Sequence, residues 1–442
     1  MKIQLSDHFT YRRLIRFVLP SIVMMIFTSV YGVVDGLFVS NFVGKTSFAA
    51  VNFIMPVIMA LGGVGFMIGT GGSAIVGQLL GEGRTEKARR TFSLMIYATV
   101  TLGVLLTLIG LLILRPVAVL LGAEGKMLSE CVAYGRILLI GTAAFMLQNV
   151  FQSFLVTAER PELGLWFTVA ASLTNILLDG LFVGVLPWGV QGAALATILS
   201  YFVGGVVPLL YFVVSKRGNL YLTSCKIDWR ALGKAFTNGS SELLTNLSMS
   251  LVNILYNFQL LRLAGEDGVS AYGVIMYVNF IFVSFFIGYS VGTAPVVSYH
   301  YGAGHSDELK NLRKKSLRLI TGFGVVMLIA SEALAWLLTK LFVGYDAALF
   351  DLTLRGFMLY SLSFAVCGFN IFGSSFFTAL GNGGVSAAIS FLRTLVFQLA
   401  VLLLLPIWLG TDGIWLAIVA SECLALAVTV FFLVTKRKRY GY

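Results

Sequence analysis

Long apolar runs, separated by short polar breaks, restrict the fold of this chain more than any other feature. Runs of twenty or more residues recur through the sequence, and about 20 residues is the length of α-helix that crosses a bilayer. Only 12% of the residues are charged and 58% are apolar, whereas a soluble domain carries about 25% charged residues. The chain is therefore expected to be an all-α integral membrane protein, and a water-soluble enzyme is excluded.

The polar breaks define twelve predicted transmembrane helices. Several of them exceed the ~20 residues needed to cross, so tilted, bent or protruding helices are expected. The spans lie near residues 14–43, 47–80, 90–114, 127–157, 164–187, 190–215, 231–262, 269–301, 314–343, 348–379, 385–409 and 412–435. We interpret the first run as a retained span and not as a signal peptide, since no small-residue cleavage site follows it.

The basic residues predict the orientation of these spans. With an even number of spans, 23 of the 31 Lys and Arg fall on one side, mainly in segments 84–90, 310–318 and 436–439. Basic residues accumulate in cytoplasmic loops, so both termini are predicted to be cytoplasmic. The net charge of +11 is thus a signal of topology, and no nucleic-acid partner is expected.

The chain repeats itself after half its length. A shift of 221 residues aligns Gly81-Glu82-Gly83 with Gly302-Ala303-Gly304, and Asn149 with Asn370. Each repeat holds six spans and enters the membrane in the same direction, so two six-helix lobes are expected around a pseudo-twofold axis along the membrane normal, with a central cleft between them. The predicted parts are an N-lobe (1–215), a cytoplasmic inter-lobe loop (216–230), a C-lobe (231–435) and a basic cytoplasmic tail (436–442).

Five acidic residues lie well inside predicted spans, away from their ends, where a charge is costly and usually functional. They are Asp35, Asp179, Glu242, Glu332 and Glu422. The shift by 221 places none of them on another acid, so the repeat preserves the scaffold and not the acids.

Asp35 and Asp179 are predicted to share one layer in the outer half of the N-lobe. Counting along the helices places them about 13 and 12 Å below the outer ends of their spans. The same counting brings further polar side chains to this layer, namely Asn175, Thr197, Tyr31 and Tyr134. These oxygens are suited to a sodium ion, and two adjacent buried carboxyl groups can instead share a proton. The alternative is that each acid is a satisfied packing group between helices.

The other intramembrane groups leave two interpretations open. Glu242 can attract a cationic substrate in the cavity or serve in packing, and Arg393 can neutralise Glu332 or Glu422 in a structural pair. Pro20 lies in the same span as Asp35 and removes a backbone hydrogen bond. It is interpreted either as a hinge or as a fixed kink.

Four segments of this sequence resemble the multidrug and toxic compound extrusion (MATE) family, in particular its bacterial branch of MepA- and DinF-like pumps. They are Pro20 with Tyr31 and Asp35, the stretch Gly77–Gly83, the stretch Asn175–Asp179 followed by Gln191–Thr197, and the stretch Pro295–Ala303. The resemblance implies an antiporter that exports amphipathic, cationic drugs in exchange for H⁺ or Na⁺ by alternating access, through a V-shaped cleft between the lobes.

The resemblance also assigns residues. It implies a cation or proton site at Asp35, Asn175, Asp179 and Thr197, lined by Tyr31 and Tyr134, and an N-lobe substrate cavity lined by Asn149 and Gln152. It implies no cofactor beyond the coupling ion, a lipid bilayer around a monomer, and the plasma membrane of a bacterium. Another branch of the family carries further acids on spans 7, 8 and 10. Here span 7 offers Glu242, span 8 offers only His300 near its inner end, and span 10 has no mid-span acid, which argues against a second sodium site in the C-lobe.

Two other functions fit the sequence less well. A flippase for lipid-linked precursors of the same superfamily needs a basic cavity for pyrophosphate, whereas the charges within these spans are mostly acidic. An intramembrane enzyme is disfavoured because the sequence holds no Gly-x-Ser-x-Gly, His-Glu-x-x-His or P-loop motif. The four cysteines show no metal-binding or disulfide spacing.

Overall fold

The computed structural model describes residues 3–43, 45–120, 122–216 and 218–442. Arg217 of the predicted inter-lobe loop lies outside these residues. Within them the chain is helical and contains no strand. The first half comprises α1 (Tyr11–Phe38), η1 (Val39–Val43), α2 (Lys45–Gly81), α3 (Thr85–Leu120), α4 (Gly125–Ile140), α5 (Thr142–Thr157), α6 (Pro161–Asp179), η2 (Gly180–Val185), α7 (Gly189–Tyr201), η3 (Phe202–Val206) and α8 (Val207–Val214). The second half comprises α9 (Trp229–Gly302), α10 (Ser306–Val343), α11 (Ala347–Ser361), α12 (Phe364–Ala379), α13 (Gly383–Phe391), η4 (Leu392–Val396), α14 (Phe397–Leu409), α15 (Thr411–Thr435) and α16 (Arg437–Tyr440).

These helices account for the twelve predicted spans. Among the described residues, nine helices are long and apolar enough to cross a membrane, and two bent pairs add one span each. The 74-residue α9 supplies two spans, because it reverses direction at Gly265, whose φ of 64° lies in the left-handed region. The bending expected of spans longer than ~20 residues occurs at 127–157 and 348–379. The first bends by 55° between α4 and α5, and the second by 48° between α11 and α12.

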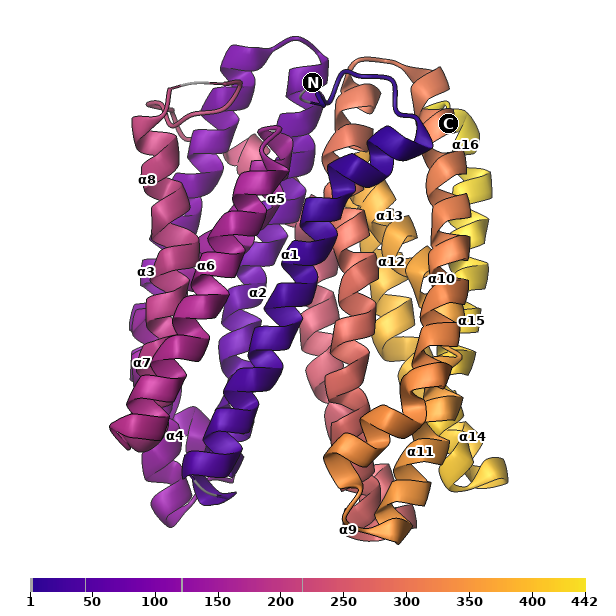
Figure 1. Ribbon diagram of the computed structural model, residues 1–442. Coiled ribbons are helices and arrows are strands. Elements are labelled where there is room, and N and C mark those ends of the chain that lie inside the picture. The colour runs from indigo at the N-terminus through magenta and orange to yellow at the C-terminus, as the bar shows by residue number, and fades with distance from the viewer. Residues whose placement is uncertain (1–2, 44, 121, 217) are drawn as a thin grey trace.

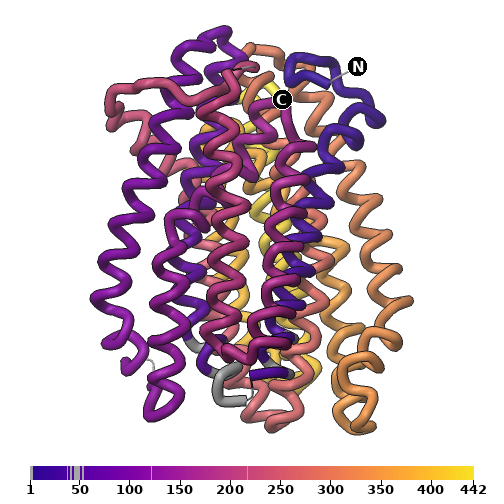
Figure 2. The backbone as a smooth tube through the Cα atoms, turned by 60° about the vertical axis from the view of Figure 1, so that its left-hand side comes forward, coloured from indigo at the N-terminus to yellow at the C-terminus, as the bar shows by residue number. Residues whose placement is uncertain are grey.

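The helices form two bundles. Figure 1 shows α1–α8 on the left and α10–α16 on the right, with α9 beside the boundary between them; we call the bundle of α1–α8 the N-lobe and that of α9–α16 the C-lobe. In Figure 2 the helices run along one common direction and the connections gather at the two ends. Both termini lie at the same end, which we call the basic end because segments 84–90, 310–318 and 436–439 belong to it.

The two lobes touch through their backbones near the basic end. A Cβ atom added to Gly71 of α2 would overlap the carbonyl oxygen of Ala235, and one added to Gly239 of α9 would overlap that of Met67. Gln78 of α2 also donates a hydrogen bond of 2.9 Å across the lobes, to a C-lobe carbonyl oxygen. Only glycine permits this approach of α2 to α9, so the lobes are closed against each other at this end.

Residues 3–10 form a strap across the basic end, from the N-lobe to the C-lobe (Figure 1). On the N-lobe side, the Leu5 amide donates to Glu159 Oε1 at 2.8 Å, between α5 and α6. On the C-lobe side, Glu308 of α10 accepts from the Phe9 amide at 3.0 Å and contacts His8 Nδ1 at 2.6 Å. Leu5 and Phe9 are fully buried. The strap therefore joins both lobes through hydrogen bonds and apolar contacts.

Four π-helical segments interrupt the spans of the described chain, and three of them lie at or near a polar residue for which a role was predicted. η2 begins directly after Asp179, and η4 contains Arg393. η1 begins four residues after Asp35. Single π turns inside α-helices occur frequently at functional sites. The shift by 221 residues does not superpose any of these segments on another, so the positions of the π-helical segments differ between the two lobes.

Candidate functional site

The structure brings Asp35 and Asp179 together from α1 and α6. Asp35 is 7% exposed and Asp179 is 0% exposed. Their carboxyl groups lie within hydrogen-bonding reach of each other when one of them carries a proton. When both are ionised they are acceptors only, and like charges in a buried site repel. The pair therefore favours the binding of a proton or of another cation.

Asn175 and Thr197 complete the polar layer beside this pair. Asn175 lies one turn before Asp179 on α6, so their side chains share a face. Its Nδ2 donates to Thr197 Oγ1 at 3.4 Å, and that hydroxyl donates to the Ala193 carbonyl one turn earlier on α7 at 3.0 Å. Because the Asn175 amino group and the Thr197 hydroxyl are thus engaged, the Asn175 carbonyl oxygen remains for a ligand.

Several buried oxygens of this layer have no hydrogen-bond partner among the described residues. They are Asp35 Oδ1, both carboxylate oxygens of Asp179, Asn175 Oδ1 and the Tyr134 hydroxyl. A buried polar group without a partner costs about 1–3 kcal/mol, and native proteins rarely leave one unexplained. Carboxylate, amide and hydroxyl oxygens are also the ligands that a hard cation such as Na⁺ accepts. This set of oxygen ligands fits a bound cation or a shared proton.

Tyrosines surround the pair, and two of them were missed in the sequence. Tyr31 and Tyr134 lie close enough to Asp35 for its negative charge to act on their hydroxyl groups, as predicted. Tyr201 of α7 does as well, and it stacks on Phe145 with ring centroids 4.5 Å apart. Helix counting would have found Tyr201, since it lies one turn beyond Thr197.

Tyr277 of α9 is the second missed tyrosine, and it comes from the other lobe. It lies within electrostatic range of Asp35. A Cβ atom added to Gly36 would lie 3.3 Å from the Tyr277 hydroxyl oxygen. No periodicity in the sequence signals this contact, because it depends on how the lobes meet. It links the C-lobe directly to the residue after Asp35.

The other predicted site residues occupy separate places. Asn149 and Gln152 are buried on α5, and Asn149 Nδ2 donates to the Gly62 carbonyl at 3.3 Å. Glu242 is half-buried on α9, within range of Arg393. Pro20 lies inside an unbroken α1.

The surroundings of Pro20 place it where α1 changes lobe. On either side of it, Val18 and Ile22 lie against Gly292 and Gly288 of α9, so closely that a Cβ at either glycine would meet them. The basic-end half of α1 thus packs in a C-lobe core, while the helix as a whole also packs against α6 of the N-lobe. The predicted hinge lies in the part of α1 that crosses between the lobes.

The remaining intramembrane acids are paired within the C-lobe. Arg393 Nε donates to both carboxylate oxygens of Glu422, at 2.8 and 3.0 Å, and Glu332 accepts from the Ser361 hydroxyl. The structure thus selects Glu422 as the partner of Arg393 from the two that the sequence left open.

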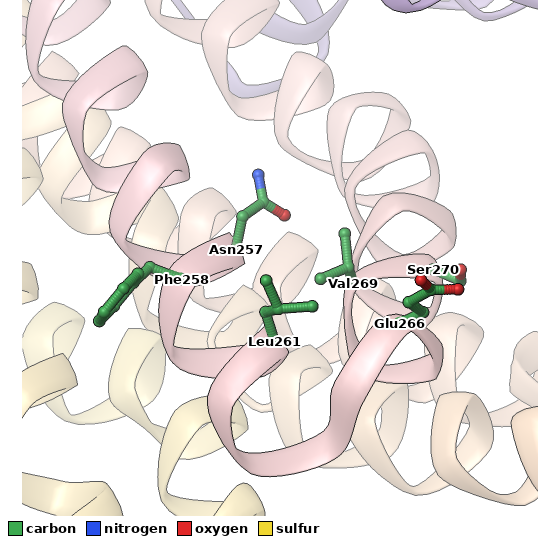
Figure 3. Close-up of a pocket in the computed structure, with 6 residues that line it drawn as sticks. All are labelled: Asn257, Phe258, Leu261, Glu266, Val269 and Ser270. Atoms are coloured by element: carbon green, nitrogen blue, oxygen red, sulfur yellow. The ribbon is translucent and has the colours of Figure 1, made fainter. Parts of the chain in front are cut away.

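A separate hollow lies at the turn of α9. Figure 3 shows Asn257, Phe258 and Leu261 on one arm of the turn, and Glu266, Val269 and Ser270 on the other. Its volume is about 390 Å³. The walls are mostly apolar, and none of the predicted site residues lines it, so it is distinct from the acidic layer.

Known proteins are similar to this chain over nearly its whole length. Over 425 residues the chain is 23% identical to the multidrug export protein MepA of Staphylococcus aureus strain MRSA252, covering 94% of this chain and 92% of that protein. MepA of Staphylococcus saprophyticus is 23% identical over 423 residues, with the same coverage.

Solved structures share the fold. The outward-facing conformation of a multidrug resistance MATE family transporter superposes with a TM-score of 0.93 at 23% identity, over 98% of this chain and 97% of that one. A MATE transporter crystallised in complex with MaL6 gives a TM-score of 0.93 at 22% identity, over 98% of both chains. These similarities show that the twelve-span MATE fold is the fold of this chain.

The family assignment follows from the sequence as well. The sequence model of the MatE family matches twice, over residues 20–181 and 243–404, two stretches of equal length that begin 223 positions apart. The double match reflects the internal repeat and covers more than half of the chain. The chain therefore belongs to the MatE family of multidrug and toxic compound extrusion transporters.

Proposed function

We propose that this transporter exports amphipathic, cationic drugs in exchange for H⁺ or Na⁺. The observation that carries the proposal is the buried pair of Asp35 and Asp179, whose oxygens lack partners in the described chain. Within a membrane interior, an ionisable group without a partner is expected to bind a translocated ion. The chain is then a secondary transporter and not an enzyme, and it needs no cofactor beyond the coupling ion.

Binding of a proton or Na⁺ to Asp35 and Asp179 would be coupled to movement of the two lobes through two elements. A proton or Na⁺ removes the repulsion between the carboxylates, so α1 and α6 can approach each other. α1 carries this change towards the basic end, where residues around Pro20 pack against α9 of the C-lobe. Tyr277 offers a second route, because it reaches from the C-lobe to the residue after Asp35.

The direction of transport follows from the proposed topology. We assign the basic end, with both termini, to the cytoplasm of a bacterial cell, since basic residues accumulate on that side of the plasma membrane. Drug then enters from the cytoplasm or the inner leaflet when the basic end opens, and leaves when it closes as described above. The drugs and the surrounding lipid are the expected partners, the transporter is expected to be a monomer, and no nucleic acid is involved.

The test is efflux of a fluorescent cation from proteoliposomes under separate pH and sodium gradients. The gradient that drives efflux identifies the coupling ion. Asp35→Asn and Asp179→Asn should abolish gradient-driven efflux, whereas Glu332→Gln, a matched neutralisation of an intramembrane acid elsewhere, should retain it. Intact coupling in both aspartate variants would show that the N-lobe pair is not the coupling site.

A lipid-linked precursor flippase stays the alternative. Its pyrophosphate would need several cations within the membrane, and Arg393, which lies between the C-lobe helices, already contacts Glu422. Scrambling of a fluorescent lipid-pyrophosphate in the same proteoliposomes distinguishes the two functions.

A further inference from the structure

Two rows of basic side chains lie at the basic end, one on α1 and one on α10. Arg12 and Arg16 are one turn apart on α1, and Lys314 and Arg318 are one turn apart on α10. All four side chains are exposed, and we call them the basic face. Like charges at this spacing repel each other and destabilise a helix, so each row would gain stability from a nearby anion.

The described chain supplies the basic face with no such anion. Among the residues that the structure describes, none of the four side chains forms an ion pair. The acids at the start of α10 are already engaged. Glu308 accepts from the Phe9 amide and contacts His8, and Asp307 lies 3.0 Å from Lys310. The counter-charge of the basic face therefore has to come from another molecule.

Tyr11 places the two rows beside each other. Arg318 Nη1 donates to the Tyr11 hydroxyl at 3.2 Å, and Lys315 Nζ lies 5.4 Å from the centre of the Tyr11 ring. Figure 1 shows the start of α1 next to the basic-end part of α10. Tyrosine is enriched where a membrane protein meets the membrane–water interface. The two rows thus form one surface at the level of that interface.

Apolar side chains continue this surface away from the basic end. Leu19 lies on the same face of α1 as Arg16 and is 50% exposed. Val325 and Ile329 follow Arg318 at helical spacing on α10 and are 49% and 63% exposed. Cations at one level with exposed apolar side chains beyond them match a phospholipid, whose phosphate lies at the interface and whose chains enter the hydrocarbon.

Membrane topology alone does not account for this arrangement. Basic residues orient a chain wherever they lie in its cytoplasmic loops, and orientation requires neither like charges one turn apart nor a second row on an adjoining helix. Clusters of about four to eight Lys or Arg next to a transmembrane helix on the cytoplasmic side are typical of binding to anionic lipids. Three of the four groups are guanidinium groups, which bind phosphate oxygens in a bidentate contact.

We propose that the basic face binds an anionic phospholipid of the cytoplasmic leaflet, with its phosphate groups between the rows of α1 and α10. A lipid with two phosphates, such as cardiolipin, offers one phosphate to each row. The start of α1 packs in a C-lobe core, and the bound lipid would reinforce that packing. The proposal adds a lipid site to the transporter and depends neither on the coupling ion nor on the drug.

Cardiolipin is the probe, and two other compounds serve as comparisons. The full-length protein in an uncharged detergent is titrated with cardiolipin, and native mass spectrometry measures the bound lipid. Phosphatidylcholine has acyl chains but no net charge, whereas inorganic phosphate has the charge but no chains. Cardiolipin should bind more tightly than either of them.

Two triple variants remove the same charge from different parts of the basic end. The test variant combines Arg12→Gln, Arg16→Gln and Arg318→Gln. The control variant combines Arg84→Gln, Lys87→Gln and Arg90→Gln, in α3 and the turn before it. In the control region Arg84 and Arg90 already have acidic partners, Glu82 and Glu86, so these cations are not expected to attract a lipid.

The test variant should bind cardiolipin about 100-fold more weakly, since each basic residue at a membrane surface contributes about fivefold. The control variant should stay within about threefold of the wild type. Equal losses in the two variants would show a diffuse attraction to the basic end and overturn the proposal. Binding of phosphatidylcholine as tight as that of cardiolipin would do the same, as would displacement of cardiolipin by an equal concentration of inorganic phosphate.

Single substitutions keep the test decisive if the triple variant does not fold. Arg318→Gln alone should weaken cardiolipin binding about fivefold, and Arg84→Gln alone should not. Equal effects of these two substitutions would also overturn the proposal. Binding is measured without drug or gradient, so a failure of the proposed export function leaves this result unchanged.

Discussion

The contact between α2 and α9 gives a quantitative prediction about how the lobes open. Gly239→Ala would place a methyl group against the Met67 carbonyl oxygen of the opposite lobe. Gly233, six residues earlier on α9, has no atom within 4 Å of the position of an added Cβ, so Gly233→Ala is a matched control on the same helix.

The magnitude follows from the cost of overpacking. Inserting a methyl group into a well-packed contact costs about 1–3 kcal/mol. The clash exists only while the lobes are closed at the basic end, so the closed state loses this energy and the open state does not. The ratio of closed to open molecules should therefore fall by about 5- to 150-fold. Gly71→Ala, on the other side of the same contact, should act in the same direction.

Distances between spin labels at the basic end would measure this shift. Glu86 of α3 and Asp307 of α10 are suitable sites, because their side chains are 75% and 99% exposed and they lie on different lobes. With the four native cysteines replaced, Gly239→Ala should add a population at longer distance and Gly233→Ala should not. Identical distance distributions in the two variants would refute the argument that glycine is required for closure.

Three further predictions concern the acidic layer and the strap. Asp179→Asn should raise the melting temperature in detergent. The substitution removes a buried group without partners, which costs about 1–3 kcal/mol, and the new amide can donate a hydrogen bond to Asp35. A lower melting temperature would contradict this. Tyr277→Phe should slow gradient-driven efflux several-fold while the melting temperature stays within a few degrees, and unchanged efflux would show that its hydroxyl is dispensable. Glu308→Ala removes the acceptor of the Phe9 amide. A loss of about 1–3 kcal/mol should make hydrogen exchange at that amide about 5- to 150-fold faster, as measured by mass spectrometry. Unchanged exchange would mean that the strap is held by burial alone.

The fold was predictable because the membrane simplifies the problem. A lipid-exposed backbone must satisfy its hydrogen bonds internally, so apolar length alone predicted the helices. The repeat then predicted their grouping. Bending of the longer spans was expected, but the positions of the bends between α4 and α5 and between α11 and α12 were not predicted, because no proline marks either break and the apolar pattern continues across both.

The candidate site was predictable where residues share one helix or one depth. Helix counting brought Asp35, Asp179 and Asn175 to one layer, and the structure places them together. It did not find Tyr277, whose position depends on the packing of the two lobes. Nor did it choose the partner of Arg393, since Glu332 and Glu422 both lie near the middle of their spans.

The π-helical segments have a consequence for how a span can rotate. A π turn holds one residue more than an α turn, so a π turn that migrates along a helix rotates every residue it passes by about 100°. Asp179 adjoins one such segment and Arg393 lies inside another. Each of these spans therefore holds an extra residue near its middle. Movement of the π turn along the helix can turn Asp179 or Arg393 towards or away from the lobe interior, while both ends of the helix stay in place at the membrane surface.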